Sequence, residues 1–141
     1  MPTNIPPAYP QARRVATQVS NLLKHTVNFN DPNIGSGVTF DESLPFGAFI
    51  ISVTVEIVTA FNAGTSNALT IGTNPTNDNN IVASTDVNPA ATGVTQVTRG
   101  LGRSLTAAGE TPVFAKYAQS GTAATAGQAI VVIEYEGGWK S

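Results

Sequence analysis

The chain has 141 residues, which is enough for one domain with a sizeable hydrophobic core. Only 11% of the residues are charged, less than half the usual quarter, so uncharged polar side chains must cover much of the surface. The net charge of -2 gives no general attraction to nucleic acid or anionic membranes, and the absence of cysteine excludes disulfides and thiolate metal sites.

The N-terminal segment is rich in proline, with four of the nine prolines among the first ten residues. Proline excludes a helix here and favours an extended course, so we expect an extended N-terminal arm over residues 1–21. The arm is either a disordered tail or a segment that lies along a partner, with Ile5 and Tyr9 as apolar anchors. Arg13 and Arg14 could hold an acidic neighbour, although a solvated pair is the commoner case. The candidate interface residues of the arm are Ile5, Pro6, Pro7, Tyr9, Arg13 and Arg14.

A long strand is predicted between Phe49 and Phe61, because apolar side chains recur there at every second position. Thr59 is the one break in the series, and Ser52, Thr54 and Glu56 occupy the opposite face. This strand is expected to lie at the centre of the fold. The side chains expected on its core face are Phe49, Ile51, Val53, Val55, Ile57 and Phe61.

Shorter strands are predicted on both sides of this central one, with turn clusters of Asn, Asp, Gly and Pro between them. No amphipathic helix and no clear internal repeat interrupts the series. We therefore predict an all-β fold, an eight-stranded jelly-roll β-sandwich over residues 22–141. The other predicted strands are 22–29, 37–40, 68–72, 81–84, 94–105, 111–118 and 128–136.

Residues with catalytic potential are few. His25 is the only histidine, and it shares a strand face with Val27 and Phe29, which indicates a packed ring rather than a metal ligand or a base. Glu134 and Glu136 lie on one face of a predicted strand, roughly 7 Å apart. They are expected to be solvated, while a small hydrolase that uses both carboxylates is the alternative. The sequence predicts no catalytic, cofactor or metal site.

Two loops and one tryptophan complete the search. The segment 77–80 offers oxygen ligands but lacks the frame of a calcium loop, so it is expected to be a turn. Arg99 and Arg103 flank a glycine-rich stretch with no following helix and no stacking aromatic residue, which argues against a phosphate or nucleic-acid site. Trp139 is expected to cap the core, to anchor an interface or to stack on a sugar.

The run from Ser52 to Gly72, SVTVEIVTAFNAGTSNALTIG, resembles a strand–loop–strand unit of small virion proteins from tailed bacteriophages. In size, low charge and strand layout the chain resembles their jelly-roll capsid cement, or decoration, proteins, among them that of a Bordetella phage. The resemblance implies a non-enzymatic protein that binds outside the capsid and clamps neighbouring subunits of the major capsid protein. It also implies a homo-oligomer, a dimer or a trimer, with the dimer favoured.

The expected location is therefore the exterior of a virion, after synthesis in the host cytoplasm. The N-terminus lacks the pattern of a signal peptide, and no stretch approaches the ~18 apolar residues of a membrane span. We expect no direct contact with nucleic acid and no membrane partner. The alternative function is a carbohydrate- or receptor-binding module of a phage tail spike or fibre, which predicts aromatic side chains around one groove.

Overall fold

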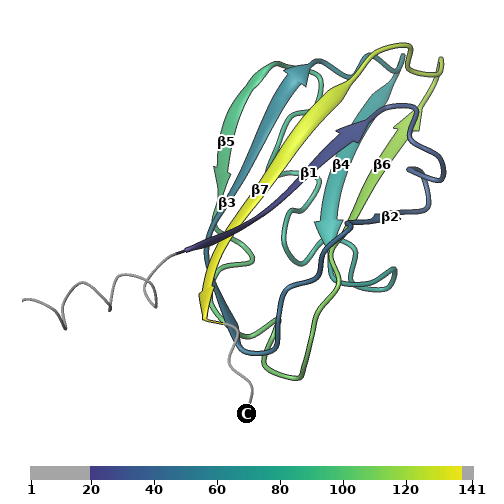
Figure 1. The fold of residues 1–141 in the computed structure, drawn as a ribbon. Helices are drawn as coiled ribbons and strands as arrows, with labels where there is room; N and C mark the ends of the chain where they lie inside the picture. The colour runs from purple at the N-terminus through teal and green to yellow at the C-terminus, as the bar shows by residue number, and fades with distance from the viewer. Residues whose placement is uncertain (1–19, 138–141) are drawn as a thin grey trace, which may run out of the picture.

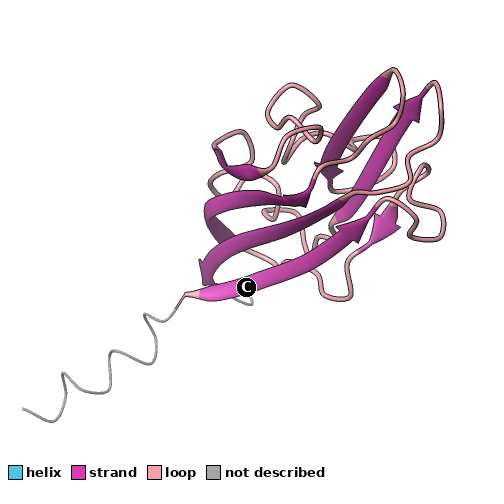
Figure 2. Cartoon of the chain, turned by 90° about the horizontal axis from the view of Figure 1, so that it is seen from above, coloured by secondary structure: helices cyan, strands magenta, loops and turns pink. Residues whose placement is uncertain are grey.

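Seven strands make up the regular structure of residues 20–137, the part of the chain that the computed structural model describes. Figure 2 shows only strands and loops in this part, which contains no helix able to span a membrane. The strands are β1 (Asn21–Asn28), β2 (Val38–Thr39), β3 (Ala48–Thr59), β4 (Ser66–Gly72), β5 (Gly93–Val97), β6 (Phe114–Ser120) and β7 (Gln128–Gly137).

The strands form two antiparallel sheets (Figure 1). The four-stranded sheet has the order β1-β7-β3-β5, and the three-stranded sheet has the order β2-β6-β4. All odd-numbered strands lie in the first sheet and all even-numbered strands in the second, so the chain changes sheet after every strand. The predicted all-β sandwich is confirmed.

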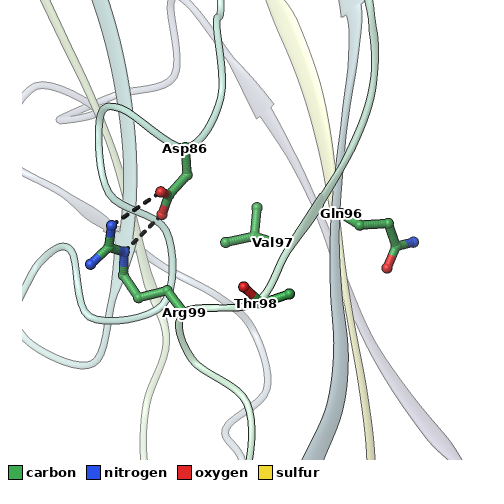
Figure 3. A pocket seen from close by; sticks show the side chains of 5 residues that line it. All are labelled: Asp86, Gln96, Val97, Thr98 and Arg99. Carbon is green, nitrogen blue, oxygen red and sulfur yellow. Dashed lines mark hydrogen bonds and ion pairs between the residues drawn. The ribbon is translucent and has the colours of Figure 1, made fainter.

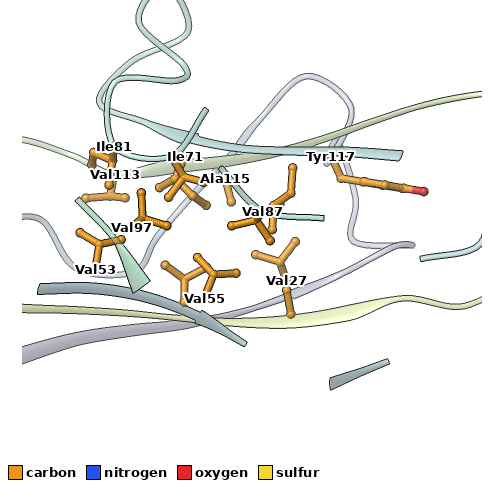
Figure 4. Packing of buried hydrophobic residues seen from close by; sticks show 14 of the residues in the cluster. Val27, Val53, Val55, Ile71, Ile81, Val87, Val97, Val113, Ala115 and Tyr117 are labelled. Carbon is orange, nitrogen blue, oxygen red and sulfur yellow. The ribbon is translucent and has the colours of Figure 1, made fainter. Parts of the chain in front are cut away.

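The core lies between the two sheets because each strand directs alternate side chains inward. In Figure 4 the valines of β1 and β3 point towards side chains of β4 and β6. Burying each of these apolar side chains stabilises the fold by about 1.5–3 kcal/mol before chain entropy is subtracted. The inward residues include Leu23, Val27, Val53, Val55, Ile57, Leu69, Ile71, Ala115, Tyr117, Val131 and Ile133.

In the N-terminal part of β3, the side chains that face the core differ from those predicted. A β-bulge lies between Ile50 and Ser52, where the pairing with β7 shifts by one residue. The extra residue reverses the alternation, so Ile50 is fully buried while Phe49 and Ile51 are 53% and 38% exposed. The prediction that Phe49 and Ile51 face the core is therefore wrong, whereas it is confirmed for Val53 and for the residues that alternate after it.

The described residues contain seven strands rather than the predicted eight, because the segment 81–84 forms only a single bridge. Val82 and Ile71 exchange backbone hydrogen bonds at 2.9 Å, beside the free edge of β4. The pairing stops at once because the carboxylate of Asp86 accepts the backbone N–H of Ala83 at 2.8 Å and starts a turn. The predicted strand 94–105 is likewise shorter and ends with β5.

Candidate interaction surface

A shallow hollow of about 350 Å³ lies at the end of β5 (Figure 3). Its two charged groups neutralise each other, since Arg99 donates from Nε and Nη2 to the Asp86 carboxylate at 2.8 and 3.1 Å. In Figure 3 the side chain of Gln96 points away from this pair, and it donates to Thr54 Oγ1 at 2.9 Å. No aromatic side chain from the described part of the chain lines the hollow, so these residues do not form the aromatic groove expected of a sugar-binding module. The lining residues are Asp86, Gln96, Val97, Thr98 and Arg99.

The ion pair of the hollow predicts a small dependence of stability on pH. The hydrogen bond from Arg99, helped by the N–H of Ala83, lowers the pKa of Asp86 from its ordinary value of 3.8. A lowered carboxyl pKa stabilises the folded protein at pH values above the ordinary pKa of the group. This stabilisation is lost as the pH falls below the ordinary pKa and through the lowered one. Asp86→Asn should therefore reduce the free energy of unfolding by less than about 1 kcal/mol at pH 7, because the pair is partly exposed. Urea unfolding should show a smaller difference in the free energy of unfolding between wild type and Asp86→Asn at pH 3 than at pH 7. An equal difference at both pH values would contradict the lowered pKa of Asp86.

The residues considered for catalysis are either packed or part of the outer surface of the sheet. His25 stacks on Phe40 with ring centroids 4.3 Å apart, so its ring is packed as predicted. Glu134 accepts a hydrogen bond from Ser52 Oγ at 3.2 Å, and Glu136 lies further along β7 at the exposed end of the strand. Within residues 20–137, no three His, Asp or Glu side chains are placed to hold a metal ion. These carboxylates belong to the outer surface of the sheet.

The outer face of the three-stranded sheet is partly covered by the chain itself, through the loop of residues 73–80, here called the covering loop. A Cβ atom on Gly72 would lie 2.4 Å from the Cα of Asp78, so the loop backbone rests directly on β4. Asp78 also accepts a salt bridge from Lys116 of β6 at 3.0 Å. The hydroxyl of Thr70 is buried beside these groups and has no hydrogen-bond partner within residues 20–137. The covering loop therefore occupies the part of this face around Gly72 and Lys116.

The outer face of the four-stranded sheet, by contrast, is formed by strands alone as far as residues 20–137 are concerned. The register of the four strands places its outward side chains in rows that run across the sheet. We define this outer face by three rows: Leu22, Glu134 and Ser52; Lys24, Val132, Thr54 and Gln96; and Thr26, Ile130, Glu56 and Val94.

This face was not among the sequence predictions, although the sequence carried a signal for it. In β7 apolar residues occupy both phases of the alternation, since Ile130 and Val132 point outward while Val131 and Ile133 point into the core. An apolar outward phase is unusual for a strand with one solvated face. The interface residues that were predicted all lie outside the described residues: Ile5, Pro6, Pro7, Tyr9, Arg13, Arg14 and Trp139.

Comparison with solved structures finds the same fold in phage capsids. A chain in the cyanophage Pam1 capsid asymmetric unit aligns with a TM-score of 0.63 at 20% identity, over 82% of this chain and 83% of that one. A chain in the acidic stable capsid structure of Helicobacter pylori bacteriophage KHP30 gives 0.60 at 19% identity, over 86% and 90%. A chain in the capsid of Ralstonia phage GP4 gives 0.51 at 17% identity, over 86% and 84%. No protein-family model and no curated protein matches the sequence. The likeness establishes that this chain shares its sandwich fold with chains found in those three phage capsids.

Proposed function

We propose that this protein is a structural component of a phage virion that binds the outside of the assembled capsid. It stabilises the capsid by clamping neighbouring subunits of the major capsid protein. The observation that carries the proposal is the likeness of the sandwich to chains in three phage capsid structures, over more than four-fifths of its length. The role is adhesive rather than catalytic.

The physical requirements of a clamp support this function. A clamp needs a rigid body, which the sandwich supplies, and a surface whose charges do not repel its neighbours. With only 11% charged residues, the chain meets the second requirement. Each attachment needs only a modest affinity, because many copies on one particle act together through their high effective concentration.

We further propose that the sandwich is a jelly roll whose eighth strand is reduced to the bridge at Val82. The alternation of the chain between two sheets supports this topology, since a jelly roll distributes eight strands over two sheets. The bridge lies at the edge of β4 and would extend the three-stranded sheet to four.

The N-terminal arm, residues 1–21, is proposed to reach across a subunit boundary, with Ile5 and Tyr9 as anchors and Trp139 as a further contact. A homodimer is the proposed form of the free protein, because two linked bodies can contact two neighbouring capsid subunits at once.

Co-sedimentation tests the function directly. Purified protein is mixed with capsid shells of the encoding phage that were assembled without it, and the particles are pelleted. We expect saturable binding with a fixed number of copies per shell and a higher temperature of shell disruption. Absence of binding to both empty and DNA-filled particles would refute the proposal.

Removal of residues 1–10 tests the arm separately. The truncated protein should fold normally, because the core described above lies within residues 20–137. Its affinity for the shells should fall by about tenfold or more, because the contacts of the arm are lost. A full-length variant with Ile5→Ser and Tyr9→Ser separates arm chemistry from arm length. If both variants decorate shells as tightly as the wild type, the arm has no clamping role.

A further inference from the structure

We infer that the outer face of the four-stranded sheet is the surface that meets the capsid shell. We also infer that the facing surface of the shell carries basic side chains around an apolar patch. This inference rests on the proposed function and adds to it the contacting face and the chemistry of the partner. It follows from the distribution of exposed apolar groups, of charge and of covering chain over the two sheets.

Exposed apolar side chains gather on the four-stranded sheet. Within residues 20–137, every clearly exposed large hydrophobic residue except Leu101 lies on a strand of this sheet. Leu101 precedes Gly102, which forms a bridge with Ile50 of β3. Leu22 on β1 and Val94 on β5 are 62% and 64% exposed, at opposite edges of the face. None lies on β2, β4 or β6. Among the described residues, exposed large apolar side chains are thus found on the strands of one sheet and not on those of the other, which favours this sheet as the interaction surface.

Four polar side chains of the face are already paired across neighbouring strands. Ser52 donates to Glu134, and Gln96 donates to Thr54 at 2.9 Å, so neighbouring strands are linked across the outer surface. Side chains that are ordered before binding lose less conformational entropy when a partner covers them. The face is therefore prepared for contact with a partner.

The charge of the face selects the partner. The face carries two carboxylates, Glu56 and Glu134, but only one positive group, Lys24. Glu136 adds a third carboxylate at the end of β7. A second copy of the same face would bring like charges together, which is unfavourable at an interface. A surface with Arg or Lys side chains would complement the carboxylates. The occupant is therefore a basic surface of the shell rather than the equivalent face of another copy.

The opposite face is less available for docking. The covering loop rests on β4 and is tied to Lys116 by the salt bridge of Asp78. The open sheet is roughly 15–20 Å wide and 30 Å long, from the spacing of strands and residues. Its area, on the order of 500 Å², is typical of a small interface with modest affinity for each copy. Such an interface suits a protein that acts in many copies on one particle.

Matched lysine substitutions on the two sheets test the inference with shells assembled without this protein as the probe. Val94→Lys places a positive charge on the proposed docking face, whereas Ala118→Lys places the same charge at an exposed position of β6. We expect Val94→Lys to weaken co-sedimentation on the order of tenfold, and Ala118→Lys to change it less than about twofold. Glu56→Lys should weaken binding as well, with a smaller loss at high salt because ions screen the charges.

Val94→Glu tests the sign of the partner's charge. It removes the same apolar side chain as Val94→Lys but should bind shells more tightly than that variant. Equal binding by wild type and Val94→Lys, or a loss confined to Ala118→Lys, would overturn the assigned face. Weaker binding by Val94→Glu than by Val94→Lys would overturn the inference that the partner surface is basic. Failure of the wild type itself to bind would instead refute the proposed function, so the two failures are distinguishable.

Discussion

Deletion of Thr54 should prevent the protein from folding, whereas deletion of Ile51, three residues earlier in the same strand, should be tolerated. Thr54 lies in a regular part of β3, where Val53 and Val55 on either side of it point into the core. Without it, the residues that follow would change face relative to those before it. Val55 would point outward, and the carboxylate of Glu56 would point into the core.

The cost of that reversal is comparable to the whole stability of the domain. Each apolar side chain that is expelled from the core costs about 1.5–3 kcal/mol, and an unpaired charge buried in its place costs several more. The total stability of a domain is only about 5–15 kcal/mol. Ile51, in contrast, is the extra residue of the bulge: Ile50 and Ser52 on either side of it face consecutive residues of β7. Its removal closes the ladder with both side chains on their present faces.

Circular dichroism and urea unfolding distinguish the two deletions. We expect a cooperative unfolding transition for the Ile51 deletion, with a loss of about 1–2 kcal/mol. The Thr54 deletion should give insoluble protein or no cooperative transition. If both deletions unfold alike, the bulge is not where the register of β3 changes.

Gly72→Ala should destabilise the fold by about 2–3 kcal/mol, because the added methyl group has no room. A Cβ atom there would lie 2.0 Å from the backbone oxygen of Asn77 and 2.4 Å from the Cα of Asp78. The obstacle is backbone, which cannot rotate away as the tip of a side chain could. The covering loop would have to lift from β4, which would also strain the salt bridge between Asp78 and Lys116.

Gly35→Ala provides the matched control, because a Cβ atom on Gly35 meets nothing within 4 Å. Its effect on the free energy of unfolding should stay within about 0.5 kcal/mol. Urea unfolding of the two variants beside the wild type measures the difference. Equal stabilities for the two variants would show that the covering loop is not seated on the sheet.

The strands that the sequence predicted best are those whose alternation stays regular. Val53, Val55 and Ile57 alternate without interruption, and all three are buried as predicted. Glu134 was predicted to face outward from a strand whose other face is buried, and it does. The polar cluster before Ile81 forms a turn, as its composition indicated, with the Asn80 side chain bonded to Thr73.

The features that were missed depend on partners far away in the sequence. Nothing in the sequence near Ile51 marks it as a bulge, because the extra residue is defined by the register of β7, more than 80 residues further along the chain. His25 was expected to be packed, yet its stacking partner Phe40 comes from a separate strand end. Pairing also decided that residues 81–84 add a bridge rather than a strand.

The sequence by itself determined that this chain is a low-charge β-sandwich, because a period of two and the chemistry of turns are properties of neighbouring residues. The tertiary structure alone decided the strand order, the position of the bulge in β3 and the difference between the two outer faces. Those features arise when segments distant in the chain meet, as when β1 pairs with β7 and the covering loop settles on β4. The exposed apolar face of the four-stranded sheet, on which the proposed docking depends, is assembled only by that pairing, although the apolar outward residues of β7 are a sequence signal for it.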